Sequence, residues 1–228
     1  MDVDRLIRAA PVEERFGPSL PQLLAPRIDR LPAIARRVGA LVAALVVVVI
    51  VAIVLRGRDP AFSYAGRPAF HTSYSRALER EATPPGALLL LEQRSATGLV
   101  ASFEVTPLAL PRYGGEISGL LPVYAVGYAR RLAAQVGPTF RLENWRSTRI
   151  INTPAYSFSY SRQLGNGRYF GRVVFITKDL SGDRHGLILS MLTSYAALKA
   201  ATKPVIPTPD SVGTAGVLFE PLERLRFG

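Results

Sequence analysis

The feature that most constrains this 228-residue chain is a run of 18 amino acids, residues 38–55, without a charged or strongly polar side chain. An α-helix of that length is roughly 27 Å long at about 1.5 Å per residue, close to the ~30 Å hydrocarbon thickness of a bilayer. Arg36 and Arg37 precede the run, and Arg56 and Arg58 follow it, so headgroup contacts can hold the helix across a membrane. A buried core helix would normally have a polar edge, and a cleaved signal peptide would have a shorter apolar run nearer the N-terminus. The run therefore predicts a single transmembrane helix.

Residues 1–37 contain seven arginines, five acidic residues and five prolines. Prolines at this spacing break any long helix, so we expect a loosely ordered Pro/Arg-rich tail that meets a cytoplasmic partner, lies on anionic lipid or is simply solvated. Within 20 residues of the apolar run, four arginines precede it and three follow it, which is a weak charge bias. Because most of the foldable sequence follows the run, we expect an uncleaved signal anchor. The tail then lies in the cytoplasm, and residues 56–228 form an extracytoplasmic domain.

The charge and the cysteine content narrow the partners of this domain. Basic residues outnumber acidic residues 28 to 17, and residues 56–228 carry +9 of the net charge of +11. In an extracytoplasmic domain, this excess of basic residues argues against nucleic acid as the partner. It favours anionic lipid headgroups or an acidic envelope polymer. Cysteine is absent, which excludes disulfides, thiolate metal sites and a cysteine nucleophile. A core built from about 170 residues must therefore stabilise the domain without covalent links.

Strand patterns dominate residues 56–228. Five segments are apolar or alternating and are bounded by turn residues: 87–92, 99–110, 156–161, 169–178 and 187–194. The first two flank Thr97-Gly98 and predict a hairpin. The last three are joined by short turns and predict an antiparallel meander, because a parallel pairing would need a crossover of about a dozen residues.

Two helices are predicted beside these strands. Residues 120–136 repeat apolar side chains every three or four positions, with Pro122 in the first turn and Gly137-Pro138 at the end. A second helix is predicted from Asp210 or Ser211 to Leu225, with a break at Pro221. Helices beside a mainly antiparallel sheet make an α+β domain. The expected fold is thus α+β, with an N-terminal single transmembrane helix followed by a mainly antiparallel sheet packed with helices.

The order of elements resembles the PsbP-like α/β/α sandwich, including its membrane-tethered and LpqN-type versions. The similar features are an initial strand pair, an amphipathic helix, a long three-stranded meander and a closing apolar-basic segment at residues 222–227. The resemblance spans about residues 60–227 and depends on element order and length, not on a motif. It implies a non-catalytic domain that binds proteins or envelope components, or that assists assembly, and it assigns no site residues.

Two groups of residues are candidates for binding. Arginines gather around the single tryptophan, on the polar side of the first predicted helix and in the segment after it: Arg130, Arg131, Arg141, Trp145, Arg146 and Arg149. They form either a contact surface or a solvated basic face. Tyr156, Phe158 and Tyr160 alternate with serines and form either an aromatic platform for a ligand or a part of the core beneath the helix. The opposite, hydroxyl-bearing face, with Arg162 and Arg172, is then the solvent side or the floor of a polar groove.

The sequence contains little that indicates catalysis. His71 and His185 lie in distant segments, and neither a Gly-x-Ser-x-Gly nor a Ser-x-x-Lys motif occurs. Residues 165–171 have the pattern of a tight turn rather than a nucleotide loop. The segment that begins at Asp179 has Arg184 and Ser190 at the positions where a calcium loop has its glycine and its bidentate glutamate. We therefore expect no enzymatic activity, no cofactor and no metal.

The function we expect is that of a membrane-anchored binding or assembly module. Residues 38–55 would contact lipid, and the outer domain would bind a membrane-protein partner. The alternative is a carrier or binder of envelope lipid or anionic polymer. A continuous apolar cavity of ligand size would favour a carrier, and a fully packed interior would exclude one.

Overall fold

The computed structural model describes residues 41–48, 59–111, 119–150, 153–178 and 184–228. The chain divides into two compact units, Met1–Arg58 and Asp59–Gly228. In the first unit, residues 41–48 are helical and exposed; the tail and the rest of the predicted span lie outside the described residues. In the part of the chain that the structure describes, no helix combines the length and the apolar character needed to cross a bilayer. The transmembrane helix therefore stays a prediction.

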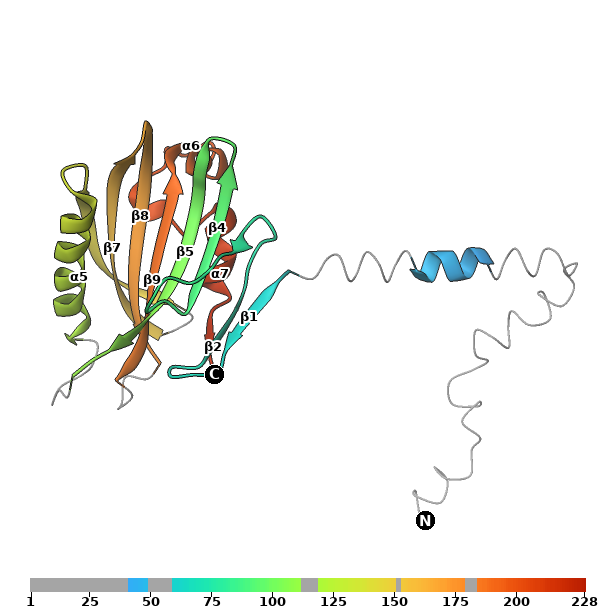
Figure 1. The fold of residues 1–228 in the computed structure, drawn as a ribbon, viewed down its shortest axis with the longest axis horizontal. Helices are drawn as coiled ribbons and strands as arrows, with labels where there is room; N and C mark the ends of the chain where they lie inside the picture. The colour runs from blue at the N-terminus through green and yellow to red at the C-terminus, as the bar shows by residue number, and fades with distance from the viewer. Residues whose placement is uncertain (1–40, 49–58, 112–118, 151–152, 179–183) are drawn as a thin grey trace, which may run out of the picture. The chain divides into compact units, whose positions relative to one another are not determined.

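The second unit contains two antiparallel sheets (Figure 1). The larger has the order β3-β4-β5-β9-β8-β7-β6, and the smaller has the order β1-β2-β10. The strands of the larger sheet are β3 (Glu79–Arg80), β4 (Leu89–Ser95), β5 (Gly98–Ala109), β6 (Arg141–Ile150), β7 (Thr153–Leu164), β8 (Gly167–Thr177) and β9 (His185–Ser194). Those of the smaller are β1 (Ala61–Tyr64), β2 (Phe70–Ser73) and β10 (Arg226–Phe227). Neighbouring strands in both sheets pair antiparallel, which confirms the mainly antiparallel α+β fold.

The predicted hairpin and the predicted meander are both present. β4 pairs with β5, and β7, β8 and β9 follow one another across the sheet. The sequence-based prediction missed β6, which extends the meander at the sheet's edge. β6 lies at the edge of the sheet, and most of its residues are exposed. Its sequence therefore lacks the apolar alternation by which the other strands were recognised.

Helices and short segments cover both faces of the larger sheet. The predicted first helix is α5 (Leu121–Val136), which packs on one face against Phe158, Tyr160 and Phe175. The other face carries α6 (Tyr195–Ala201), the segment that follows it and the smaller sheet. A second hydrophobic cluster, including Phe70 and Leu222, lies on that side.

The predicted helix from residue 210 to residue 225 is wrong. The structure instead has two short 3₁₀ helices, η2 (Pro209–Ser211) and η3 (Gly216–Leu218), and the five-residue helix α7 (Phe219–Glu223). Gly213 and Gly216 have φ angles of 80° and 71°, a left-handed conformation that interrupts a continuous α-helix. This chain of short turns follows the sheet closely and forms one wall of the site described next.

Candidate functional site

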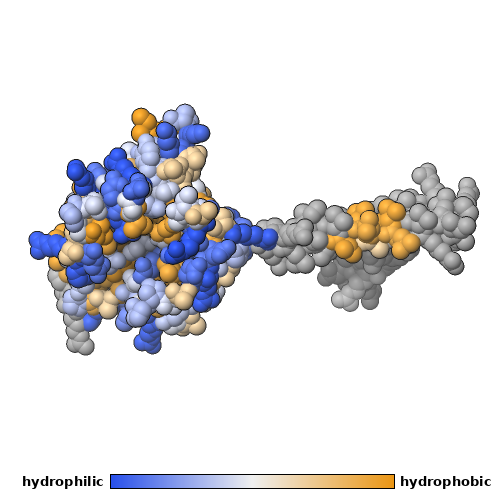
Figure 2. Space-filling view, turned by 45° about the horizontal axis from the view of Figure 1, so that its top comes forward, coloured by the Kyte–Doolittle hydropathy of each residue, from blue (hydrophilic) through white to orange (hydrophobic). Residues whose placement is uncertain are grey.

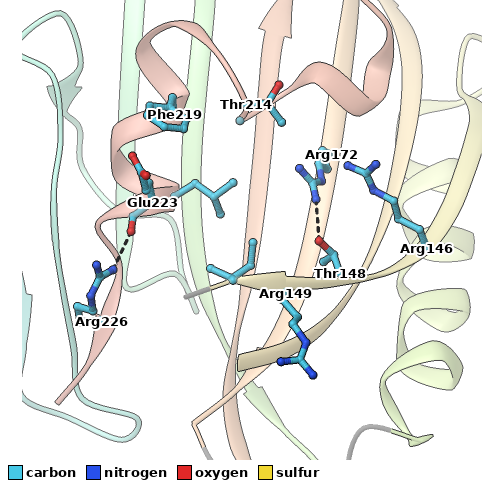
Figure 3. Close-up of a pocket in the computed structure, with 11 residues that line it drawn as sticks. Arg146, Thr148, Arg149, Arg172, Thr214, Phe219, Glu223 and Arg226 are labelled. Carbon is cyan, nitrogen blue, oxygen red and sulfur yellow. Dashed lines mark hydrogen bonds between the residues drawn. The ribbon is translucent and has the colours of Figure 1, made fainter. Parts of the chain in front are cut away.

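A cavity of about 550 Å³ lies between β6, β8 and the C-terminal segment (Figure 3). Four arginines from three strands line it: Arg146, Arg149, Arg172 and Arg226. Apolar side chains complete its walls: Ile150, Phe219 and Leu222. Glu223 at the edge of α7 is the acidic residue of this lining. The cavity thus combines positive charge with apolar surface.

Arg172 is the most unusual residue of the cavity, because its side chain is only 3% exposed. It lies on β8 between Ser159 of β7 and Met191 of β9. Its hydrogen bonds are long: Nη1 donates to the Val212 carbonyl and Nη2 to Thr148 Oγ1, both at 3.4 Å. Its buried Nε has no hydrogen-bond partner among the described residues. The guanidinium is therefore poorly satisfied by the protein itself.

The charge of Arg172 is also poorly compensated. Over the described ranges, no carboxylate oxygen forms an ion pair with it. Burial and the nearby charge of Arg146 lower the pKa of Arg172 to about 10, against a smaller opposing effect of Asp210. A buried cation without a paired anion is costly. An anion in the cavity would reduce that cost.

Asp210 connects the C-terminal segment to the sheet beside the cavity. Its carboxylate accepts hydrogen bonds from Asn144 Nδ2 at 2.7 Å and from Ser159 Oγ at 2.5 Å. Partial burial raises the pKa of Asp210, but these hydrogen bonds and the charges of Arg146 and Arg172 together lower it below its ordinary value. Asp210 therefore stays ionised and holds η2 against β6 and β7.

The serine face of β7 is not the solvent side. Ser157, Ser159 and Ser161 are all buried, because the C-terminal segment covers this face. The alternative of a polar groove fits better, since Ser161 donates to Glu143 at 2.7 Å and Arg172 lies on the same face. Arg162 instead lies on the opposite face of β7, together with the aromatic side chains, because successive side chains of a strand point to opposite faces.

The aromatic residues of β7 are core rather than platform. Phe158 and Tyr160 are buried and Tyr156 is half-buried. The Phe158 ring lies 5.2 Å from the Trp145 ring, and the Tyr160 ring stacks on Phe140 at 5.1 Å, as measured between ring centroids. Side chains of α5 complete this cluster, so the Phe158 and Tyr160 rings have little surface to offer a ligand.

The structure does not gather the predicted arginine group into one patch. Arg130 and Arg131 are exposed on α5, on one side of the sheet. Trp145 is half-buried against the aromatic core instead of standing at the centre of a surface. Arg141 lines a separate cavity with Ser161 and Arg168. Arg146 and Arg149 line the described cavity. Whether any of these residues makes a functional contact stays a prediction.

Sequence reasoning placed Arg172 on a face that was either the solvent side or the floor of a polar groove, and it did not assign Phe219 or Arg226 to a site. One signal was available for Arg172, because it interrupts the apolar stretch of β8 from Tyr169 to Ile176. Phe219 and Arg226 reach the cavity through the fold of a distant segment. His71 and His185 lie in different sheets. Within the described ranges, no group of three potential metal ligands is found.

No family profile matches the sequence, and no curated protein matches it. Among solved structures, cyanobacterial PsbP (CyanoP) from Synechocystis sp. PCC 6803 is similar over 75% of this chain and 95% of its own, at 10% identity and a TM-score of 0.46. LpqN of Mycobacterium tuberculosis, described as involved in cell envelope biogenesis, is similar over 75% and 92%, at 8% identity and a TM-score of 0.48. A Bacteroides thetaiotaomicron VPI-5482 protein matches at 9% identity and a TM-score of 0.44, over 75% of this chain and 48% of its own, so this chain spans about half of its length. PsbP and LpqN, the two types named by the resemblance in element order, are thus both among the similar structures.

Proposed function

We propose that residues 59–228 form a non-catalytic binding domain whose cavity holds an anionic ligand that also carries an apolar group. The observation that carries this proposal is Arg172, a buried cation with an unpartnered Nε and no paired carboxylate among the described residues. A phosphate or carboxylate in the cavity would supply the missing charge and accept charge-assisted hydrogen bonds from the guanidinium.

The remaining lining fits the two parts of such a ligand. Arg146 adds positive charge beside Arg172, whereas the Arg149 side chain points away from Arg172 (Figure 3). Phe219 offers apolar contact on the opposite wall, and Leu222 of the same helix adds to the apolar lining. The volume of about 550 Å³ lies within the range of roughly 300–1,000 Å³ common for small-molecule sites. Arginine retains its proton near neutral pH and so suits anion binding better than proton transfer.

We infer the setting of this domain from the sequence. The apolar run at residues 38–55 would anchor the chain in the cell membrane, with the N-terminal tail in the cytoplasm. The ligand would then be an envelope lipid or a fragment of an acidic envelope polymer. A reporter fused after Gly228 tests the topology, because a reporter active only in the cytoplasm would overturn it.

Calorimetric titration of the full chain in a non-ionic detergent tests the binding proposal. Octyl phosphate, inorganic phosphate and octanol separate the contributions of charge and apolar group. We expect octyl phosphate to bind best and Arg172→Met to weaken it at least about tenfold, equivalent to about 1.4 kcal/mol. The matched control is Arg130→Met, an exposed arginine on α5, which should bind as wild type does. Equal affinity in Arg172→Met and wild type would overturn the proposal.

The exposed edge of β6 favours a second candidate, the binding of a membrane-protein partner. β6 pairs with β7 on one side and carries exposed charged side chains along its length. An unpaired edge can accept a strand from another chain, although its charges also discourage indiscriminate pairing. Crosslinking in membranes followed by mass spectrometry tests this candidate. Repeated recovery of the chain without a partner crosslinked to β6 would exclude it.

A further inference from the structure

An ordered turn after α6 exposes two adjacent apolar side chains. Val205 is 67% exposed and Ile206 is 78% exposed. In Figure 2 most of the surface of residues 59–228 is hydrophilic, with apolar residues in small groups. Single exposed apolar residues need no explanation, but two neighbours projecting together from a turn do.

Hydrogen bonds hold this turn, residues 202–207, in place. Val205 N donates to the Thr202 carbonyl at 2.9 Å. The Thr202 hydroxyl contacts the carbonyls of Leu198 at 2.9 Å and Val205 at 3.2 Å, which ties the turn to the end of α6. Pro207 is buried directly after the exposed pair. The backbone therefore presents Val205 and Ile206 to the outside and prevents them from folding back onto the core.

Two exposed lysines lie close to this apolar tip in the sequence. Two of the three lysines in the chain, Lys199 and Lys203, lie exposed on α6 and in the turn. The sequence contains no acidic residue between Asp183 and Asp210. The turn thus has an apolar tip, and the charged side chains of the segment that contains it are positive.

We propose that the 202–207 turn inserts into the interfacial region of an anionic lipid membrane. Apolar side chains enter the boundary between headgroups and acyl chains, while flanking lysines contact anionic headgroups. The inference rests on the membrane anchor proposed above. Only three residues separate Leu55 from Asp59, so a spanning helix would keep Asp59 within about 14 Å of the membrane surface at 3.3–3.6 Å per residue. The turn gives the domain a second contact with the bilayer and so fixes its orientation there.

The absence of cysteine allows a direct test in the full chain. Val205→Cys and Val123→Cys are each labelled with an environment-sensitive fluorophore and reconstituted into vesicles of mixed anionic and neutral lipid. Val123 is the matched control because it is 66% exposed and lies near the start of α5. That start borders Pro154 and Arg149, at the opposite end of the sheet from α6. Vesicles that carry protein are isolated by flotation before measurement.

We expect a blue shift at position 205 and about twofold or greater quenching by spin-labelled lipid, with neither effect at position 123. Replacing both Lys199 and Lys203 by Glu should reduce the quenching at position 205, as should vesicles of neutral lipid alone. Equal signals at the two positions in floated vesicles would overturn this inference and leave the anchor intact. Failure to float would overturn the anchor and this inference together. A blue shift that appears without lipid and grows with protein concentration would indicate contact with a second copy and would also overturn it.

Discussion

The hydroxyl of Ser159 on β7 donates a 2.5 Å hydrogen bond to the carboxylate of Asp210 in η2, 51 residues further along the chain. The same carboxylate accepts a hydrogen bond from Asn144 on β6. One aspartate thus connects two neighbouring strands to the segment that covers them. Because that segment supplies Phe219 and Leu222 to the cavity, its attachment shapes the site.

Replacing Asp210 should detach this segment. Asp210→Ala leaves the Ser159 hydroxyl and the Asn144 amide without their acceptor, so we expect a loss of about 1–3 kcal/mol in the free energy of unfolding. Urea unfolding followed by circular dichroism measures the loss. Glu79→Ala on β3, an exposed strand of two residues, is the control. Equal stability of the two variants would show that the Asp210 contacts contribute nothing.

The stabilisation by Asp210 should disappear in acid. Its pKa is lowered in the folded state, so its contribution is fully present above the ordinary value of 3.8 and is lost as the pH falls through the folded value. The stability difference between wild type and Asp210→Asn should therefore narrow progressively below that pH. A constant difference down to the lowest pH at which the protein is folded would contradict the lowered pKa.

Arg172→Met should stabilise the ligand-free protein while it weakens ligand binding. The substitution removes a buried, unpaired charge and keeps most of the side-chain volume, so we expect a gain of about 1–3 kcal/mol. Thermal and urea unfolding without ligand measure it. Arg130→Met again serves as the exposed control. A loss of stability would mean that the two long hydrogen bonds to Val212 and Thr148 outweigh the cost of burying the charge.

Gly171→Ala should destabilise the domain by overpacking. A Cβ at position 171 would lie 2.2 Å from Tyr160 Cζ, and the Tyr160 ring is buried and stacked on Phe140. The ring has little room to move, so we expect a cost of about 1–3 kcal/mol. Gly119→Ala is the control because open space surrounds position 119. Unchanged stability in Gly171→Ala would show that the ring can shift freely.

Tyr160 should make the protein sensitive to alkali. Burial raises the pKa of Tyr160 to about 12, with smaller contributions from Tyr128 and Glu104 and an opposing one from Arg162. The unfolded chain releases this proton near the ordinary value of 10, so stability falls as the pH rises between these two values. Tyr160→Phe removes that dependence. Its stability relative to wild type should therefore improve by about 1 kcal/mol between neutral pH and about pH 11. If the stability of wild type and of Tyr160→Phe changed with pH in parallel, the raised pKa of Tyr160 would be refuted.

Local sequence patterns predicted those parts of the fold in which one side of an element is apolar. The 3–4 residue spacing around Leu121 and Tyr128 defined α5, and the alternation at Phe158 and Tyr160 defined β7. β6 was missed because it is an exposed edge strand. α6 was missed because seven residues are too few to establish a helical period.

The site was less predictable, because its residues meet only through long-range packing. Alternating serines usually mark a solvent-exposed face, yet Ser157 and Ser159 are buried by a segment about 50 residues later. Buried arginines are rare, so the position of Arg172 within an apolar strand was the one local indication of a special role. The partners of Arg172 at Thr148 and Val212 come from separate parts of the chain.

The smaller sheet has a mechanical consequence. β1 is its edge strand and pairs with β2 over four residue pairs, from Ala61 opposite Ser73 to Tyr64 opposite Phe70. β2 also pairs with β10, which carries Arg226. Tension applied through Asp59 would load β1 first, and peeling it away would leave the β2–β10 pair and the cavity wall in place. Under tension, β1 would thus separate from β2 before the binding cavity is disturbed.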